Sequence, residues 1–153
     1  MIGDGPLRHR IQKFIAVYKL EQCVHVNCSF VPYSQYLRLM NEADIFIHPS
    51  VTAKDGDSEG GAPTAILEAQ AMGMPVLSTV HADIPNIVAP EQSALLSPEK
   101  DFEKLSDNLL SLLENQDQWV KMGSIGREFV QQNHDIRKEV VLLEQKYQQL
   151  FIK

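Results

Sequence analysis

Apolar positions along the chain follow two different patterns. Five stretches repeat apolar residues every three or four positions, which is typical of helices with one buried face. Shorter apolar runs lie between these stretches and have the length of buried strands. The helical stretches cover residues 7–18, 36–43, 102–112, 119–129 and 136–150, and the short runs cover 45–47, 76–77 and 94–96, with a weaker candidate at 23–26.

Short strands that alternate with helices favour an α/β fold, in which a parallel sheet has helices on its faces. The last three helical stretches follow one another without a strand, so we expect the sheet to end near residue 97. The turn Gly3-Asp4-Gly5 normally follows a strand, yet only Met1 and Ile2 precede it. We therefore expect residues 1–153 to form one domain shortened on its N-terminal side, the C-terminal piece of a larger protein.

Composition narrows the class of protein. The chain has 153 residues with 44% hydrophobic content, which suits one globular domain with a core. Its formal net charge of -6 argues against a nucleic-acid partner or an anionic membrane surface. The pair Cys23 and Cys28 makes a poor zinc site, and we expect two buried or half-buried thiols in a reducing cytoplasm.

The segment DGDSEGGAPTAILEAQ, residues 55–70, joins the 45–47 strand to an apolar helix that starts near Pro63 or Thr64. In an open parallel sheet, ligands bind at the carboxyl ends of the strands, where this segment lies. Gly60 and Gly61 allow backbone N–H groups to approach a ligand, and the helix start presents free N–H groups and a positive dipole end. This combination suits a phosphate group or sugar hydroxyls.

Acidic residues in this segment have more than one interpretation. Glu68 lies among alanines and apolar residues of the helix, where an unpaired carboxylate would be destabilising, so it needs donors. A ligand's hydroxyl groups or a group within the chain could supply them, and spacing alone leaves both open. Asp55, Asp57 and Glu59 suit an exposed loop, and their spacing lacks the pattern of a calcium loop, so we expect no metal.

The order of motifs along the chain resembles a known family. GDGPL, FVP, ADIFIHPS, EGGAPTAILEAQAMGMPV, ST and IPNIV together are similar to retaining glycosyltransferases of the GT-B fold, family four, also called glycosyl transferases group 1. The resemblance covers almost the whole chain and corresponds to the C-terminal domain that binds the nucleotide-sugar donor. It implies a Rossmann-like sheet flanked by helices, with extra helices at the C-terminus.

The resemblance also implies roles for individual residues. It makes Glu59 the catalytic, sugar-facing residue and Glu68 the residue that binds the donor's ribose. The family usually leaves seven residues between these glutamates, whereas eight lie between them here, which makes the Glu68 assignment the firmer of the two. The sugar would be lined by Gly60, Gly61, Ala62 and Pro63, and the diphosphate would meet the backbone N–H of Thr64.

Other positions carry weaker implications. The segment Ser29-Phe30-Val31 corresponds to the loop that flanks the base, although Ser29 replaces the usual glycine, and core packing is the alternative for Phe30 and Val31. Gly3 either approaches the donor or serves only its turn. We expect His48 to be structural and see no partner pattern for His25, His81 or His134. The basic residues of the first helix suit a solvated face; they are Arg8, His9, Arg10 and Lys13.

The family implies a complete function and its partners. The whole protein would transfer a sugar from a UDP-, GDP- or ADP-sugar, with retention, to a surface polysaccharide or lipid-linked glycan held by an N-terminal domain absent here. We expect no cofactor, no essential metal and no nucleic acid, and a cytoplasmic location with a peripheral position at the inner membrane face as an option. The chain alone would bind nucleotide weakly, transfer little sugar and self-associate through its last helix. The alternatives are a non-catalytic nucleotide-binding or interaction module, and another GT-B enzyme, which the EGGAPTAILEA motif fits less well.

Overall fold

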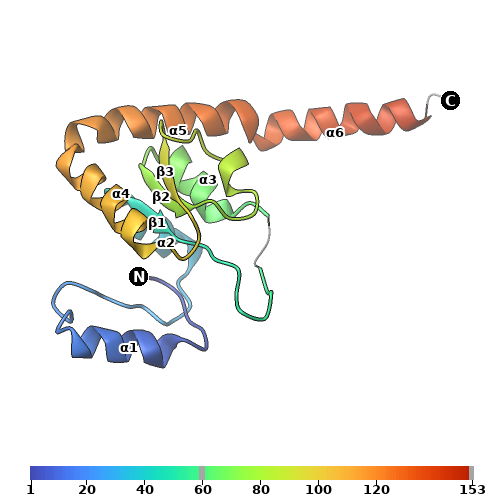
Figure 1. Ribbon diagram of the computed structural model, residues 1–153. Helices are drawn as coiled ribbons and strands as arrows, with labels where there is room; N and C mark the ends of the chain where they lie inside the picture. The colour runs from blue at the N-terminus through green and yellow to red at the C-terminus, as the bar shows by residue number, and fades with distance from the viewer. Residues whose placement is uncertain (59–60, 152–153) are drawn as a thin grey trace. The chain divides into compact units, whose positions relative to one another are not determined.

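The computed structural model describes residues 1–58 and 61–151 (Figure 1). Its internal contacts divide the chain into two compact units, Met1–Met40 and Asn41–Lys153. The expected α/β class is confirmed by a parallel sheet with helices packed against it. The elements are α1 (Arg8–Val17), α2 (Tyr33–Asn41), β1 (Phe46–His48), α3 (Thr64–Ala71), β2 (Val76–Thr79), η1 (Ile84–Asn86), β3 (Ala94–Ser97), α4 (Phe102–Glu114), η2 (Gln116–Gln118), α5 (Trp119–Asn133) and α6 (Ile136–Phe151).

The sheet of the larger unit has three parallel strands in the order β1-β2-β3. Val76 of β2 lies opposite Phe46 of β1 on one side and Ala94 of β3 on the other. All four residues of β2 are buried, as expected for a central strand covered on both faces. The sheet ends at Ser97, so the predicted end near residue 97 is confirmed.

Helices pack on this sheet in a way that the apolar periodicity predicted. α4 packs against β2 and β3, whereas α3 packs against β1, β2 and α5. Asp101 caps α4, because its side chain accepts a hydrogen bond from the Lys104 backbone N–H at 2.9 Å. Fully or almost fully buried apolar side chains form the core between these layers, among them Ile66, Leu77, Ile84, Val88, Ala94 and Leu112.

The contact between α3 and α5 is unusually close. A Cβ atom added at Gly123 would lie 1.8 Å from the carbonyl oxygen of Gly73, so only glycine lets these backbones meet. Beside this contact, the buried amide of Gln70 donates to the Ile87 carbonyl at 2.7 Å and accepts from the Ser93 hydroxyl at 2.9 Å. Arg127 donates to the Ala71 carbonyl at the end of α3, at 2.8 Å. We call Gln70, Gly73, Ser93 and Gly123 the packing contact.

The smaller unit contains less regular structure than the sequence predicted. Residues 23–26 form no strand, so the strand expected there is wrong. A turn follows α1 and reaches Cys23. The β-pairing near this turn is a single parallel bridge between Ile2 and Asn27. Cys28 is half-buried, as expected, but Cys23 is exposed. The prediction of two buried or half-buried thiols is therefore wrong for Cys23, because this residue lies in a turn where its side chain is exposed.

α6 differs from the other helices of the larger unit. Figure 1 shows it continuing beyond the end of α5 and away from the sheet, and no residue of it is buried. Its apolar side chains are exposed, so the buried face expected for residues 136–150 is absent among the described residues; they include Ile136, Val140, Leu143, Tyr147 and Leu150. No helix within the described part of the chain has the length and apolar character needed to cross a bilayer.

Candidate functional site

The carboxyl ends of the three parallel strands meet at one edge of the sheet, where open α/β sheets bind ligands. A cavity of about 270 Å³ opens at this edge, between the ends of β1 and β2 and the start of α3. Its lining comes from both strand ends and from the helix start: His48, Ser50, Gly61, Ala62, Pro63, Thr64, Ala65 and His81. The sequence had predicted a ligand site at this edge.

The start of α3 supplies the positive end of the cavity. Pro63 is the N-cap and makes no side-chain hydrogen bond to the helix, and the first turn holds no acidic residue. The first N–H groups of the helix and its dipole therefore meet the cavity without a side-chain cap. Gly61, just before the helix, has a φ of +77°, a conformation that favours glycine. Neither Lys nor Arg occurs among the described residues that line the cavity, so the positive end of the cavity comes from the helix start. A small anion or a sugar fits such a wall better than an apolar ligand does.

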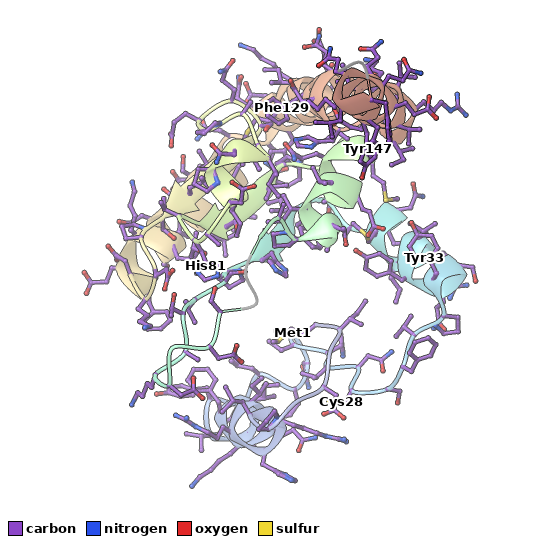
Figure 2. All side chains as sticks on the ribbon, turned by 90° about the vertical axis from the view of Figure 1, so that its right-hand side faces the viewer. Met1, Cys28, Tyr33, His81, Phe129 and Tyr147 are labelled. Carbon is purple, nitrogen blue, oxygen red and sulfur yellow. The ribbon has the colours of Figure 1, made fainter. Side chains whose placement is uncertain are left out.

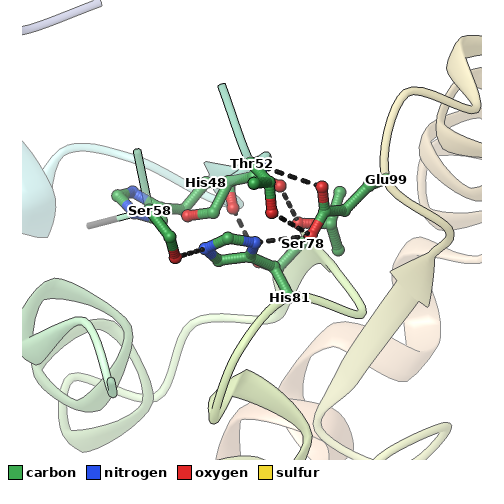
Figure 3. Close-up of polar contacts among 8 residues, drawn as sticks. His48, Thr52, Ser58, Ser78, His81 and Glu99 are labelled. Carbon is green, nitrogen blue, oxygen red and sulfur yellow. Dashed lines mark hydrogen bonds and ion pairs between the residues drawn. The ribbon is translucent and has the colours of Figure 1, made fainter. Parts of the chain in front are cut away.

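A polar network borders the cavity on the side of β2 and β3 (Figure 3). The ring Nδ1 of His81 lies 2.6 Å from Glu99 Oε1, and the Thr52 backbone N–H donates to Glu99 Oε2 at 2.7 Å. The other ring nitrogen, Nε2, lies 3.3 Å from the Ser58 hydroxyl. Because a carboxylate only accepts, we place a proton on Nδ1. Figure 2 shows His81 beside the loop that follows β1.

Glu99 is the residue of this network whose pKa is lowered. The Thr52 backbone N–H first, and then the His81 ring, hold the pKa of Glu99 below its usual value of 4.5, because both donate to the charged form; partial desolvation opposes them. The Glu99 carboxylate is therefore ionised at neutral pH and presents two charged acceptor oxygens to neighbouring loops.

Hydroxyl groups of β2 fix the backbone that leaves β1. Ser78 donates to the His48 carbonyl at 2.6 Å, and Thr79 donates to the Ser50 carbonyl at 2.5 Å. Farther along, the loop closes on itself through Asp55, whose side chain accepts from the Asp57 N–H at 3.2 Å. Asp55 and Asp57 are exposed, which confirms the loop interpretation for these two residues.

The residues predicted to bind a donor are partly brought together here. Gly61, Ala62, Pro63 and Thr64 line one cavity. Glu59 and Gly60 lie outside the described residues. Glu68 is half-buried in the second turn of α3 and has an interaction within the chain. Its ribose-binding role stays a prediction.

The other predicted residues belong to the smaller unit. Gly3 has a φ of +146° and donates to the Asn27 carbonyl at 3.0 Å, and it lines a cavity of about 270 Å³ near the start of α1. Ser29 donates from its backbone to the Asn27 side chain at 3.0 Å, and Val31 is half-buried. Phe30 is 92% exposed, so core packing is wrong for it. The basic residues of α1 are all exposed, which confirms a solvated face.

Sequence reasoning missed His81 and Glu99. The expectation that His81 has no partner is wrong, because Glu99 and Ser58 both contact its ring. A signal was nonetheless present: His81 comes two residues after the end of β2, and Glu99 comes two residues after the end of β3. Residues that follow neighbouring parallel strands reach the same edge of the sheet. His48, taken as structural, also lines the cavity.

Comparisons with known proteins point to one family. The family model described as Glycosyl transferases group 1 matches residues 1–129. The chain is 36% identical over 142 residues to the putative colanic acid biosynthesis glycosyltransferase WcaL of Escherichia coli (strain K12), a match covering 92% of this chain and 34% of WcaL. It is 43% identical over 112 residues to the amylovoran biosynthesis glycosyltransferase AmsK of Erwinia amylovora, covering 73% of this chain and 27% of AmsK.

A solved structure has the same fold. The Anabaena protein Alr3699/HepE, in complex with UDP-glucose, superposes with a TM-score of 0.75 at 20% identity, covering 97% of this chain and 39% of HepE. The expected architecture of a GT-B C-terminal half is thereby confirmed. The chain spans between about a quarter and a third of the length of these curated relatives.

Proposed function

Because the chain belongs to the group 1 glycosyltransferases, we propose that it binds a nucleotide-diphosphate sugar in the cavity at the carboxyl edge of its sheet. One observation carries this proposal: the uncapped start of α3 and the small residues before it form one wall of that cavity. The complete protein then transfers the sugar, with retention, to a surface polysaccharide or lipid-linked glycan. The names of WcaL and AmsK support the polysaccharide, and the UDP-glucose complex of HepE supports the donor class.

Each part of the donor has an assigned place. The diphosphate lies at the backbone N–H of Thr64, where the helix N-terminus stabilises negative charge. The sugar lies over Gly61, Ala62 and Pro63, with Gly60 and the sugar-facing Glu59 completing its site. Glu68 binds the ribose hydroxyls. In the smaller unit, taken by itself, the family resemblance supports base-flanking roles for Ser29, Phe30 and Val31 and a donor-facing role for Gly3.

The chemistry of transfer explains why a helix N-terminus is suited to this site. When the bond between sugar and nucleotide breaks, negative charge develops on the departing diphosphate. Backbone N–H groups that already point at this charge stabilise the transition state without having to reorient. In this proposal α3 supplies that stabilisation, and the reaction needs no metal ion. A metal-dependent rate would contradict this part.

The exposed face of α6 supports a proposal about association. Apolar side chains along α6 have no covering partner among the described residues, including Val140, Leu143 and Tyr147. Exposed apolar stripes of this kind favour burial against another surface. We expect the chain to self-associate with increasing concentration, and sedimentation of a strict monomer at high concentration would contradict this.

Calorimetric titration with UDP, GDP and ADP tests the donor site. We expect one of the three to bind with a Kd near ~1 mM, about 4 kcal/mol of binding free energy, and thereby to identify the base. Glu68→Ala should weaken that binding at least tenfold, since a charged hydrogen bond to the ribose contributes roughly 1.5–3 kcal/mol. Alanine is the strongest helix former, so an unravelled helix would not explain the loss.

The matched control is Glu114→Ala, which removes an exposed carboxylate from α4 and should leave the affinity unchanged. Failure of all three nucleotides to bind the wild-type chain would contradict the proposal. Equal affinity of the wild-type chain and Glu68→Ala would contradict the role of Glu68 alone.

A further inference from the structure

Two side chains at the ends of β2 and β3 join the loop before α3 to the rest of the sheet edge. Glu99 binds His81 through one oxygen and the Thr52 backbone through the other, and His81 reaches Ser58. We propose that His81 and Glu99 are positioning residues, a role that rests on the donor site proposed above. They hold the loop of residues 52–58 at the sheet edge beside the cavity.

Glu99 is placed to brace two loops at once. Its Oε2 accepts from the Thr52 N–H at 2.7 Å, and its Oε1 accepts from the His81 ring at 2.6 Å and from the Thr52 hydroxyl at 3.3 Å. The His81 side chain is 5% exposed and that of Glu99 is 24% exposed, so water competes little for these bonds. Hydrogen bonds to a carboxylate in a sheltered place are among the stronger ones in proteins.

His81 connects Glu99 to Ser58, the residue that precedes the donor segment. The bond from Nδ1 to Glu99 fixes the ring plane, which aims Nε2 at the Ser58 hydroxyl (Figure 3). Ser58 directly precedes Glu59, the residue proposed to face the sugar. The same ring lines the cavity together with Thr64 and Ala65. A displacement of His81 therefore changes the cavity wall and the position of Ser58, and small misplacements at such sites weaken function strongly.

A purely structural role for the pair predicts different behaviour. Structural polar groups in this chain connect parts of the core: Gln70 joins α3 to the Ile87 carbonyl and to Ser93, away from the cavity. The partners of His81 and Glu99 are loop residues at the cavity, Thr52 and Ser58. Loss of the pair should therefore change loop order and donor affinity more than it changes the stability of the whole fold.

Hydrogen exchange tests the bracing of the loop. In Glu99→Gln one carboxylate oxygen is replaced by an NH₂ group, which donates and does not accept. The variant therefore loses one of the two acceptor oxygens that bind the Thr52 N–H and the His81 ring. We expect amides of residues 52–58 to exchange about tenfold faster than in the wild-type chain, while those of β2 are unchanged. The matched control is Glu91→Gln, which removes an exposed loop carboxylate just before β3. Unchanged exchange of the loop in Glu99→Gln would overturn the proposal.

Nucleotide affinity tests the positioning role. The variants are Glu99→Gln and His81→Asn; asparagine keeps an N–H near the place of Nδ1 but removes Nε2. The ligand is the one of UDP, GDP and ADP that binds the wild-type chain. Both variants should bind it about tenfold more weakly, a loss of about 1.4 kcal/mol of binding free energy. The ring ¹⁵N signals of His81 should shift when that nucleotide is added to the wild-type chain, which a merely structural ring would not show.

The outcomes separate this inference from the proposed function. If the wild-type chain binds a nucleotide, and Glu99→Gln and His81→Asn bind it equally well, the positioning role is overturned and the donor site stands. If the wild-type chain binds no nucleotide, the donor site itself is contradicted, and the pair is reduced to a structural contact. Faster loop exchange, weaker binding and shifted ring signals together would support the positioning role.

Discussion

The two sides of the larger unit use buried polar groups for different purposes. At the packing contact, the partners of Gln70 and Ser93 within the described part of the chain are one another and backbone groups, while the glycines at 73 and 123 bring backbone against backbone. At the strand-end edge, His81 and Glu99 bond to loops and leave a cavity beside them. The first arrangement tolerates no change of shape. The second holds loop segments beside the cavity where a ligand is to bind, so we expect its residues to affect binding more than stability.

The largest effect is expected from Gly123→Ala. The new Cβ would lie 1.8 Å from the Gly73 carbonyl oxygen, and since backbone lies on both sides, α5 must move away from α3. We expect a loss of roughly 3 kcal/mol of unfolding free energy, the upper part of the range for overpacked sites. Urea unfolding would measure it, with Ser124→Ala, an exposed position on the same helix, as the control. A loss no larger than that of the control would show that the packing contact is not rigid.

A smaller effect is expected from Gln70→Leu. Leucine fills a similar volume but leaves the Ile87 carbonyl without its donor and the Ser93 hydroxyl without one of its acceptors. An unsatisfied buried polar group costs roughly 1–3 kcal/mol, so we expect about 2 kcal/mol less stability. Nucleotide affinity, measured on the folded fraction, should not change. A Gln70→Leu variant that kept its stability but lost nucleotide binding would reverse the comparison between the two sides.

The smallest effect is a pH dependence at the strand-end edge. The pKa of Glu99 is lowered in the folded chain, so its ionised form stabilises the fold above about pH 4.5, and this contribution is lost as the pH falls through the lowered value. Glu99→Gln lacks the contribution at every pH. The stability difference between wild type and Glu99→Gln should therefore shrink as the pH falls below 4.5, in urea unfolding between about pH 3 and pH 7. A difference that grew on acidification would contradict the bonding of Glu99 described above.

The sequence predicted the elements better than their contacts. Apolar periodicity located α4 and α5, and short apolar runs located the three strands. Asp101 was recognisable as a cap because capping depends on neighbours in sequence. The strand expected at residues 23–26 was wrong, since a short apolar run needs a partner strand that periodicity cannot supply. Resemblance to the family predicted the cavity residues from Gly61 to Thr64.

Other features depend on contacts between distant residues. His81 and Glu99 are 18 residues apart, and their bond exists because β2 and β3 are parallel neighbours. The approach of Gly123 to Gly73 likewise requires α5 to cross α3. The approach of Gly123 to Gly73 leaves no local pattern in the sequence, and the pairing of His81 with Glu99 is indicated only by their matching positions after β2 and β3. The exposure of Cys23 also follows from the turn that contains it rather than from its residue type.

An NMR titration tests the central claim most directly, because it reports both sides of the larger unit in one experiment. Backbone amide signals of the ¹⁵N-labelled chain would be followed while the nucleotide selected by calorimetry is added. We expect shifts at residues 48, 50–58, 61, 62, 64, 65 and 81, and none at Gly73 or Gly123 in the packing contact. Shifts centred on the α3–α5 side, or no shift at the strand-end edge at saturating nucleotide, would contradict a donor site at this edge.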